Sequence, residues 1–275
     1  MLHRRPRAVF LDAGNTLVQL DYGVLAAVAG RRRAPAAAAA AVAAVAPVAP
    51  EAIRRAEWAA RVRWDALLAE ARLVAGSPPA GIRSPAGAAS TAVAPAAAST
   101  ESGATFRQLV TMIFEEAGLG LEGAALARAV DEIQDYHQAH NLWSRPHPYA
   151  IRVLEDLKRL GMKLAVVSNS GGALAPLLER LGLERVLDAI VDSGVIGVEK
   201  PAPQIFVAAA ERLGVAAAEA VHVGDLYGID VVGARAAGAE PVLIDPASLW
   251  PQTDCVKIRD LTAMPELVRR ARPAA

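Results

Sequence analysis

The chain has very little cysteine and no excess of charge, and both shortages limit what it can be. Cys255 is the single cysteine among 275 residues, which excludes an internal disulfide and any metal site built from several cysteines. It lies in a segment typical of a late strand, where we expect a small buried apolar residue. The 29 basic and 29 acidic side chains give a formal net charge of zero. Charge therefore provides no argument for binding nucleic acid or an anionic membrane surface.

The sequence also lacks a long run of strongly apolar residues. Much of its 53% hydrophobic content is alanine in tracts, and aromatic residues make up only 4%. The tract at 34–50 follows three arginines, but it is alanine-rich, contains Pro35 and Pro47, and is too short to span a membrane. We expect a helical or partly ordered surface segment there. No secretory signal is evident, so we expect a cytoplasmic protein.

Most of the remaining chain alternates short apolar runs with amphipathic helical patterns. Such alternation favours a doubly wound parallel sheet in an α/β fold. The apolar runs predict strands at 8–11, 163–167, 189–192, 220–223 and 241–244. The helical patterns between them lie at 149–160, 171–181, 203–213 and 230–237.

Residues 21–141 interrupt this alternation with an all-helical block. Helices are predicted at 51–74, 105–117 and 121–140, and residues from about 77 to 103 form a low-complexity insert without periodicity, which we expect to be flexible. The predicted domains are thus a core of residues 1–20 and 142–275 and a helical domain of residues 21–141. The apolar stripe predicted for the first helix consists of Ile53, Trp58, Val62, Trp64, Leu67 and Leu68.

Polar side chains follow three of the predicted strands, at the edge where open α/β sheets place their chemistry. Asp12 ends the first strand, Ser168 and Asn169 follow the second, and Asp225 follows a later one, while Lys200 lies in a proline-rich loop. If these strands are neighbours, the groups converge on one pocket. Two carboxylates suit Mg²⁺, Ser168 or Asn169 can donate to a phosphate oxygen, and Lys200 can neutralise a phosphate dianion.

Four segments carry a family resemblance: DAGNT at 12–16, VVSN at 166–169, KPAPQIF at 200–206 and VGDLYGID at 223–230. In order and in position after strands, they resemble the four motifs of the haloacid dehalogenase-like (HAD) hydrolase superfamily. The resemblance covers residues 1–20 and about 142–275. It implies a Rossmann-like, doubly wound core with an inserted all-helical cap domain that closes over the site and selects the substrate.

The resemblance also implies a role for each motif residue. Asp12 would be the nucleophile that forms an aspartyl-phosphate, which water then hydrolyses. Ser168 would hold the transferring phosphoryl group, and Lys200 would orient Asp12 and the phosphate. Asp230 would be a supporting acid beside the metal, although from its place at a helix start it can instead cap that helix. The implied magnesium ligands are Asp12, Gly14, Asp225 and Asp230, and the implied substrate-binding residues are Asn15, Thr16 and Asn169.

Position 14 departs from the family pattern. The family's phosphatases usually carry a second Asp there, which protonates the leaving oxygen, whereas this chain has Gly14. Glycine keeps the backbone carbonyl for the cation but loses a proton donor that is typically worth about 10²–10⁴-fold in rate. Either another group donates the proton, or the natural leaving group needs none, or the protein is slow or only binds its ligand.

The expected function is Mg²⁺-dependent hydrolysis of a small phosphorylated metabolite, with no nucleic-acid or membrane partner. A 2-haloacid dehalogenase, which needs no Mg²⁺, and a catalytically weakened phosphate-binding protein stay open as alternatives. The spacing of Asp225 and Asp230 favours a bound cation. The substrate and the oligomeric state are not determined by the sequence. His222 is expected to be a packed core residue, and Tyr22, Trp143 and His147 either pack near the hinges or face the substrate.

Overall fold

The computed structural model describes residues 1–33, 47–74, 103–252 and 254–272, and their side chains except those of 71–74, 103 and 104. The predicted insert at about 77–103, apart from its last residue, and most of the alanine tract at 34–50 lie outside these residues.

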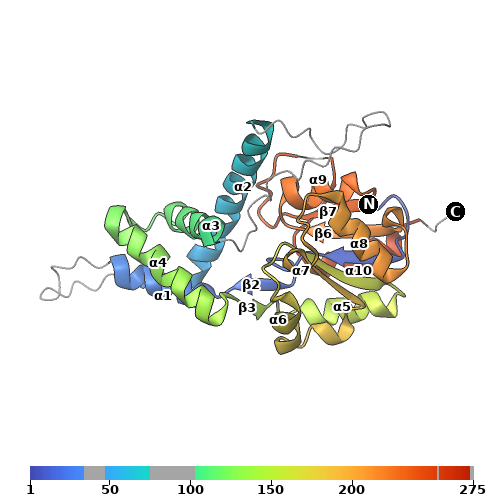
Figure 1. The fold of residues 1–275 in the computed structure, drawn as a ribbon, viewed down its shortest axis with the longest axis horizontal. Helices are drawn as coiled ribbons and strands as arrows, with labels where there is room; N and C mark the ends of the chain where they lie inside the picture. The colour runs from blue at the N-terminus through green and yellow to red at the C-terminus, as the bar shows by residue number, and fades with distance from the viewer. Residues whose placement is uncertain (34–46, 75–102, 253, 273–275) are drawn as a thin grey trace, which may run out of the picture.

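A six-stranded parallel sheet forms the core of the fold (Figure 1), in the order β5-β4-β1-β6-β7-β8. The first strand lies in the interior of the sheet, because β1 pairs in parallel with both β4 and β6. The result confirms the predicted doubly wound parallel sheet. The strands are β1 (Ala8–Leu11), β4 (Lys163–Ser168), β5 (Ala189–Asp192), β6 (Ala220–Gly224), β7 (Glu240–Ile244) and β8 (Val256–Ile258).

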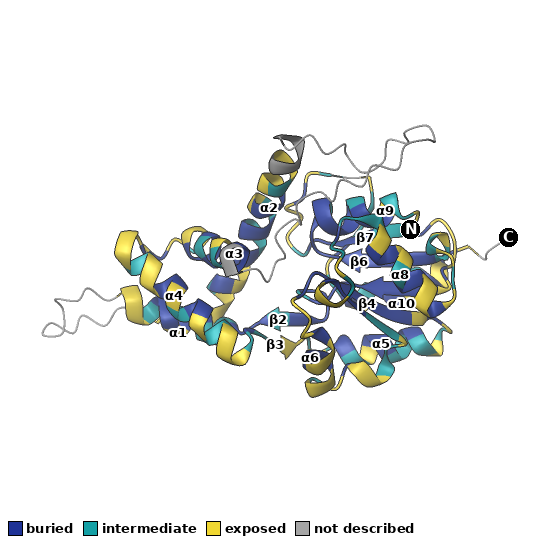
Figure 2. Cartoon of the chain, viewed as in Figure 1, coloured by how far each residue is buried: buried dark blue, intermediate teal, exposed yellow. Residues whose placement is uncertain are grey.

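Helices cover both faces of this sheet, and alternate residues of β1 face opposite layers, as the two-residue period of a strand requires. Val9 and Leu11 pack in one apolar cluster with α5 (Ala150–Arg159), α6 (Leu174–Arg180) and α10 (Met264–Arg270). Ala8 and Phe10 pack in another with α8 (Pro203–Leu213) and α9 (Val232–Ala236). Figure 2 shows the strands as the most continuously buried part of the molecule. Shorter helical turns are η1 (Glu184–Val186), α7 (Ser193–Ile196), η2 (Ala217–Glu219) and η4 (Leu261–Ala263).

Four helices form the cap: α1 (Tyr22–Arg33), α2 (Pro50–Val74), α3 (Gly103–Glu116) and α4 (Gly123–His140). An antiparallel ribbon of β2 (Val18–Leu20) and β3 (Trp143–Pro146) joins them to the core. The apolar centre of the cap continues into the core through Leu226, Ile229 and Trp250, so α2 lies directly against the core (Figure 1). None of the described helices combines the length and apolar composition needed to cross a membrane.

Several predicted boundaries were wrong. The helix predicted at 171–181 begins only at Leu174, because the Asp192 carboxylate accepts the N–H groups of Gly172 and Leu174 and holds the preceding turn. The helix predicted at 230–237 begins as a wide turn, η3 (Tyr227–Val231), and becomes α-helical only at Val232. The ribbon strands β2 and β3 were not predicted.

The buried face of α2 also differs from the predicted apolar stripe. Leu67 is 39% exposed, and Trp58 and Val62 are only partly buried. The face that packs inward repeats at intervals of three and four residues, as a helix face must, but it consists mostly of alanine and charged residues. Its members are Ile53, Ala56, Glu57, Ala60, Arg61, Trp64 and Asp65.

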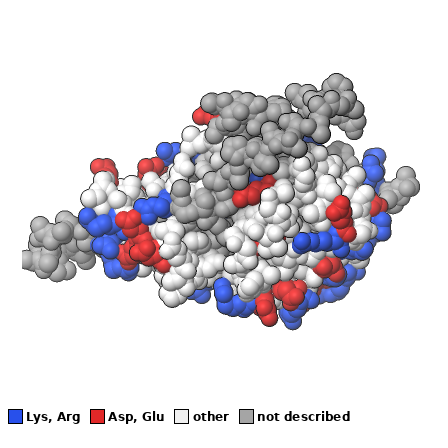
Figure 3. Space-filling view, viewed as in Figure 1, with Lys and Arg blue, Asp and Glu red and all other residues white. Residues whose placement is uncertain are grey.

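Lys and Arg are interspersed with Asp and Glu on the face shown in Figure 3. This mixture agrees with the formal net charge of zero. The described part of that face carries no broad field of one sign, and the sharper electrostatic features of the molecule are buried.

Candidate active site

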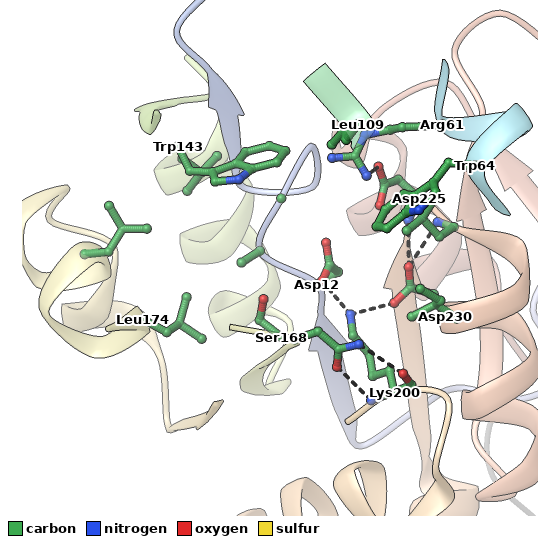
Figure 4. Close-up of a pocket in the computed structure, with 17 residues that line it drawn as sticks. Asp12, Arg61, Trp64, Leu109, Trp143, Ser168, Leu174, Lys200, Asp225 and Asp230 are labelled. Atoms are coloured by element: carbon green, nitrogen blue, oxygen red, sulfur yellow. Dashed lines mark hydrogen bonds and ion pairs between the residues drawn. The ribbon is translucent and has the colours of Figure 1, made fainter. Parts of the chain in front are cut away.

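The sheet order brings the predicted residues to one edge. Asp12 follows β1, Ser168 ends β4 and Asp225 follows β6, and these three strands are neighbours. Their side chains line a cavity of about 60 Å³, together with Asn169 and Lys200. Figure 4 shows Asp12 pointing into the space between Ser168 and the cap. A single water needs about 10–15 Å³ of such space, so the cavity admits a group of roughly phosphate size.

Lys200 links the nucleophile position to a second carboxylate. Its ammonium Nζ donates to Oδ1 of Asp12 and, at 2.7 Å, to Oδ1 of Asp230. Burial alone would lower the pKa of Lys200, but attraction to Asp12 and Asp230 outweighs it and raises that pKa. Lys200 is therefore a buried permanent cation that touches Asp12. Lys200 contacts Oδ1 alone, and none of the described residues donates a hydrogen bond to Oδ2 of Asp12.

Asp230 is fully occupied by protein donors. Its Oδ1 also contacts Nε2 of His222 at 2.9 Å, and its Oδ2 accepts the backbone N–H groups of Asp225 and Leu226 at 3.2 and 3.0 Å. Burial would raise the pKa of Asp230, but Lys200 and His222 outweigh it and hold that pKa well below the usual range. Asp230 does not cap α9, because its Oδ2 accepts the N–H groups of Asp225 and Leu226, which precede that helix. Its contacts position Lys200 and the backbone of Asp225.

His222 and Asn169 also hold other site groups in place. The His222 ring is fully buried and lies edge-on to Phe206, with ring centroids 4.9 Å apart. Asn169 donates to the carbonyl of Lys200 at 3.0 Å and accepts its N–H at 2.7 Å. The Asn169 amide thus fixes the backbone from which the Lys200 side chain extends. Its predicted role in binding substrate stays a prediction.

The cap supplies two charged residues that the sequence did not reveal. Arg61 of α2 lies 2.9 Å through Nη1 from Oδ2 of Asp225 and donates through Nε to Glu57 at 3.0 Å. Glu57 also accepts from Asn15 at 2.9 Å and from the Tyr22 hydroxyl at 2.6 Å. Glu57 is fully buried and Arg61 is 4% exposed. A Glu and an Arg four residues apart on a helix are more typical of a solvated surface pair, so the sequence offered no signal of their burial.

A second carboxylate of the cap is hydrogen-bonded to the loop that follows Asp225. Asp65, also on α2, accepts the backbone N–H of Gly228 at 2.9 and 3.0 Å. The Trp250 indole approaches the same carboxylate at 3.4 Å and packs edge-on against Trp58, with ring centroids 6.4 Å apart. The cap helix is therefore fixed to the turn between Asp225 and Asp230 by both polar and apolar contacts.

Burial dominates the ionisation of the two candidate metal carboxylates. Desolvation raises the pKa of Asp12 despite the Lys200 charge, and it raises the pKa of Asp225 to about 8 despite the Arg61 charge. The buried carboxylates of Asp12, Asp225, Asp230 and Glu57 face only two buried cations, Lys200 and Arg61. Four negative and two positive groups leave a formal charge of −2 when all are ionised.

This excess of two negative charges would be balanced by one divalent cation. The carboxylates of Asp12 and Asp225 and the carbonyl of Gly14 are hard oxygen donors of the kind Mg²⁺ binds, with water and substrate oxygens completing its shell. Within the described ranges, no cluster of three or more His, Cys, Asp or Glu side chains forms a metal site by itself. A cation here would therefore depend on the backbone carbonyl and on substrate or water.

Trp143 and Val18 are the residues of the β2–β3 ribbon that line the cavity. The Trp143 ring lies beside Gly14, where an added Cβ would meet ring atoms at 3.3 Å, and the Arg61 guanidinium lies 5.2 Å from its centroid. Tyr22 and His147 do not line this cavity. Tyr22 binds Glu57, and His147 contacts the Asn15 carbonyl through Nε2 at 3.1 Å.

Asn15 and Thr16 do not line the cavity. Asn15 adopts a left-handed backbone conformation, with φ at 55°, and its amide bridges Glu57 and Asp225, the latter at 3.2 Å. Thr16 is fully buried, and its hydroxyl has no hydrogen-bond partner among the described residues. The predicted contacts of both residues with substrate stay predictions.

Comparison with known proteins identifies the family. A family model for haloacid dehalogenase-like hydrolases matches residues 6–238. Glyceraldehyde 3-phosphate phosphatase of Methanopyrus kandleri is 43% identical over 111 residues, which cover 40% of this chain and 47% of that protein. Ribulose-1,5-bisphosphate 5-phosphatase of Halopiger xanaduensis is 38% identical over 117 residues, covering 42% and 48%. The chain thus spans about half the length of these curated relatives.

Solved structures agree on the fold. A HAD phosphatase from Thermococcus onnurineus has a TM-score of 0.51 at 22% identity, covering 98% of this chain and 100% of that one. A dehalogenase with an intermediate complex has a TM-score of 0.58 at 20% identity, covering 97% and 98%. Phosphatases and dehalogenases thus share this architecture, and similarity at this level shows the fold alone. The motif resemblance and the expected fold are confirmed, and the chain belongs to the haloacid dehalogenase-like hydrolase family.

Proposed function

We propose that the protein is a Mg²⁺-dependent phosphatase that hydrolyses a small phosphorylated metabolite through an aspartyl-phosphate on Asp12. The observation that carries the proposal is the Asp12–Lys200 contact at the floor of a phosphate-sized cavity. Lys200 holds Oδ1 of Asp12, so Oδ2 is left to attack phosphorus. The phosphatase names of the relatives from Methanopyrus and Halopiger support the same reaction class.

Each residue then has a chemical task. The ammonium of Lys200 aligns Asp12 and offsets the charge of the phosphoryl oxygens, and the Ser168 hydroxyl donates to one of them. Asp230 and Asn169 hold Lys200 in place from its two ends. The cap residues Arg61, Trp64 and Leu109 cover the cavity and exclude bulk water, which strengthens these interactions.

Asp12, Asp225 and the Gly14 carbonyl would hold Mg²⁺, which when bound supplies charge stabilisation to the transferring phosphoryl group. Asp230 acts one step away, because its oxygens already accept from Lys200, His222 and two backbone N–H groups. Gly14 takes the place of the general acid usual in the family's phosphatases.

A 2-haloacid dehalogenase is the second candidate, and one contact favours it. The Arg61 guanidinium already pairs with Asp225, so that carboxylate has a positive partner without a metal ion. A halide also leaves without a proton, which is compatible with Gly14. The remaining deficit of two positive charges around the cavity favours the metal-dependent phosphatase over this alternative.

The test is hydrolysis of p-nitrophenyl phosphate by the wild type and by Asp12→Asn, each with Mg²⁺ and with EDTA. Asp131→Asn is the matched control, because Asp131 is exposed on the cap and pairs only with Arg107 among the described residues. We expect turnover that needs both Mg²⁺ and Asp12 and that survives Asp131→Asn. Release of halide from 2-chloropropionate in EDTA, without phosphate release from the ester, would establish the dehalogenase instead.

A further inference from the structure

The glycine at position 14 is not required by its backbone. Its φ lies outside the left-handed region, so an ordinary L-residue fits the conformation, and what limits the position is the Trp143 ring, which lies 3.3 Å from where a Cβ would stand. The indole thus occupies the space into which a side chain at position 14 would extend. The chain has filled that space with an apolar ring that carries no acidic proton.

The other cavity residues on the side opposite Asp12, which we call the wall, also lack an acidic proton. In phosphoryl transfer the attacking and leaving oxygens lie roughly in line across phosphorus, so the leaving oxygen faces away from Asp12. Figure 4 shows Trp143, Arg61 and Leu109 on the cap side of Asp12, with Ser168 and Lys200 on the other side. An indole, a guanidinium and an aliphatic side chain cannot protonate a leaving alkoxide near neutral pH.

The buried carboxyl groups near this wall act as acceptors. Glu57 accepts from Asn15, Tyr22 and Arg61, and Asp225 accepts from Asn15 and pairs with Arg61. In the Mg²⁺-bound protein Asp225 would be a metal ligand and therefore ionised, and Glu57 already accepts three hydrogen bonds, so neither group is placed to protonate a leaving oxygen. The described wall therefore offers a departing oxygen a positive charge and no proton.

Arg61 is suited to receive an anion there. Its Nε and Nη1 contact Glu57 and Asp225, while Nη2 has no acceptor among the described residues. A guanidinium presents planar N–H groups that match a carboxylate well. The cavity of about 60 Å³ is of phosphate size, so little enclosed space is left beside the phosphoryl group, which favours a small leaving group.

We propose that the natural substrate is a small acyl phosphate, whose leaving group departs as a carboxylate beside Arg61. The inference rests on the proposed phosphatase function and names its substrate class. Oδ2 of Asp12 forms a bond to phosphorus, the bond from phosphorus to the acyl oxygen breaks, and its electron pair leaves with the carboxylate. Water then cleaves the aspartyl-phosphate, so acyl phosphate and water give carboxylate and dihydrogen phosphate. No proton is transferred to the leaving group.

The first experiment compares leaving groups in the wild type. Acetyl phosphate, p-nitrophenyl phosphate and propyl phosphate are assayed with Mg²⁺, and Asp12→Asn provides the background for spontaneous hydrolysis. We expect kcat/KM to fall steeply as the pKa of the leaving group rises, with propyl phosphate at least about 10²-fold below acetyl phosphate, as loss of a general acid predicts. Propyl phosphate turnover within tenfold of acetyl phosphate would overturn the proposal.

The second experiment restores an acid at position 14. Gly14→Asp is combined with Trp143→Ala to make room for the side chain, and Gly14→Ala with Trp143→Ala is its matched control. We expect the Asp-bearing protein to exceed the Ala-bearing one by about 10²–10⁴-fold on propyl phosphate and by little on acetyl phosphate. An equal gain on both substrates would contradict a missing-acid explanation. If these variants fail to fold, the wild-type series still decides.

The phosphatase function and the acyl phosphate proposal are overturned by different results. Absence of Asp12-dependent hydrolysis of all three substrates removes the phosphatase function, and the acyl phosphate proposal with it. Efficient Asp12-dependent hydrolysis of propyl phosphate removes only the acyl phosphate proposal.

Discussion

Replacing Arg61 by methionine is the sharpest test of how the cap and core are joined. Methionine keeps much of the side-chain volume but removes the guanidinium that lies 2.9 Å from Asp225 and 3.0 Å from Glu57. Both carboxylates are fully or almost fully buried. The formal charge around the cavity changes from −2 to −3, and two buried carboxylates lose their shared cation.

Removal of one partner from a buried ion pair costs about 3–5 kcal/mol. At about 2–4 °C per kcal/mol for chains of this size class, the midpoint of thermal unfolding should fall by about 6–20 °C. Glu57→Gln in the Arg61→Met background removes one of the stranded charges, so the double variant should lose less stability than Arg61→Met alone. Mg²⁺ should raise the midpoint of Arg61→Met more than that of the wild type.

The assay is thermal unfolding with and without Mg²⁺, and Arg63→Met is the control. Arg63 lies two residues further along α2, where it is exposed and pairs with Glu115 at 2.8 Å, so its replacement should change the midpoint little. Equal midpoints for the Arg61 and Arg63 variants would refute the inference that the guanidinium stabilises the buried carboxylates.

Two further predictions concern residues of the core, and the first uses a cap glycine for comparison. In Gly224→Ala the new Cβ would lie 2.2 Å from Cγ of Asp230, so stability and Asp12-dependent activity should both collapse. Gly30→Ala, which has open space around its Cβ, should instead gain up to about 1 kcal/mol of helix stability. Intact activity in Gly224→Ala would contradict the packing argument. In EDTA, the free energy of unfolding should fall as pH rises from about 5 to 8. The reason is that burial raises the pKa of Asp225 in the folded protein to about 8. An acid that holds its proton more tightly when folded loses that stabilisation as pH rises through the folded pKa. The slope is at most about 1.4 kcal/mol per pH unit for one proton, and urea titrations should show it reduced in Asp225→Asn; parallel profiles would contradict this assignment.

The core and its carboxylates were predictable because their signals are local. A strand such as β1 is a short apolar run that ends in a carboxylate, and parallel strands bring such ends to one edge. Asp12, Ser168 and Asp225 were therefore placed together from the sequence, once β4, β1 and β6 were taken as neighbours. Lys200 follows no strand, so its place in the pocket was inferred from its charge and its proline-rich loop, and its role toward Asp12 came from the family motif.

The cap contacts were not predictable because their signals are long-range. β2 and β3 are three and four residues long, and each gains its strand conformation only from a partner more than 120 residues away. On α2, large apolar residues were expected to face inward. The alanines at 56 and 60 instead bring the helix close to the core, and the Glu57–Arg61 pair finds its acceptors and donors there.

The Glu57–Arg61 pair also explains how the cap can place a cation beside the site without supplying the positive charge that a metal ion would bring. Its two charges cancel, so the core's own balance is unchanged: Asp12, Asp225 and Asp230 against Lys200 still leave a formal charge of −2. The pair is oriented, however, with Arg61 lining the cavity and Glu57 behind it, held by Asn15 and Tyr22. The cap therefore adds a local positive field beside the reacting groups while the deficit that favours a divalent cation remains.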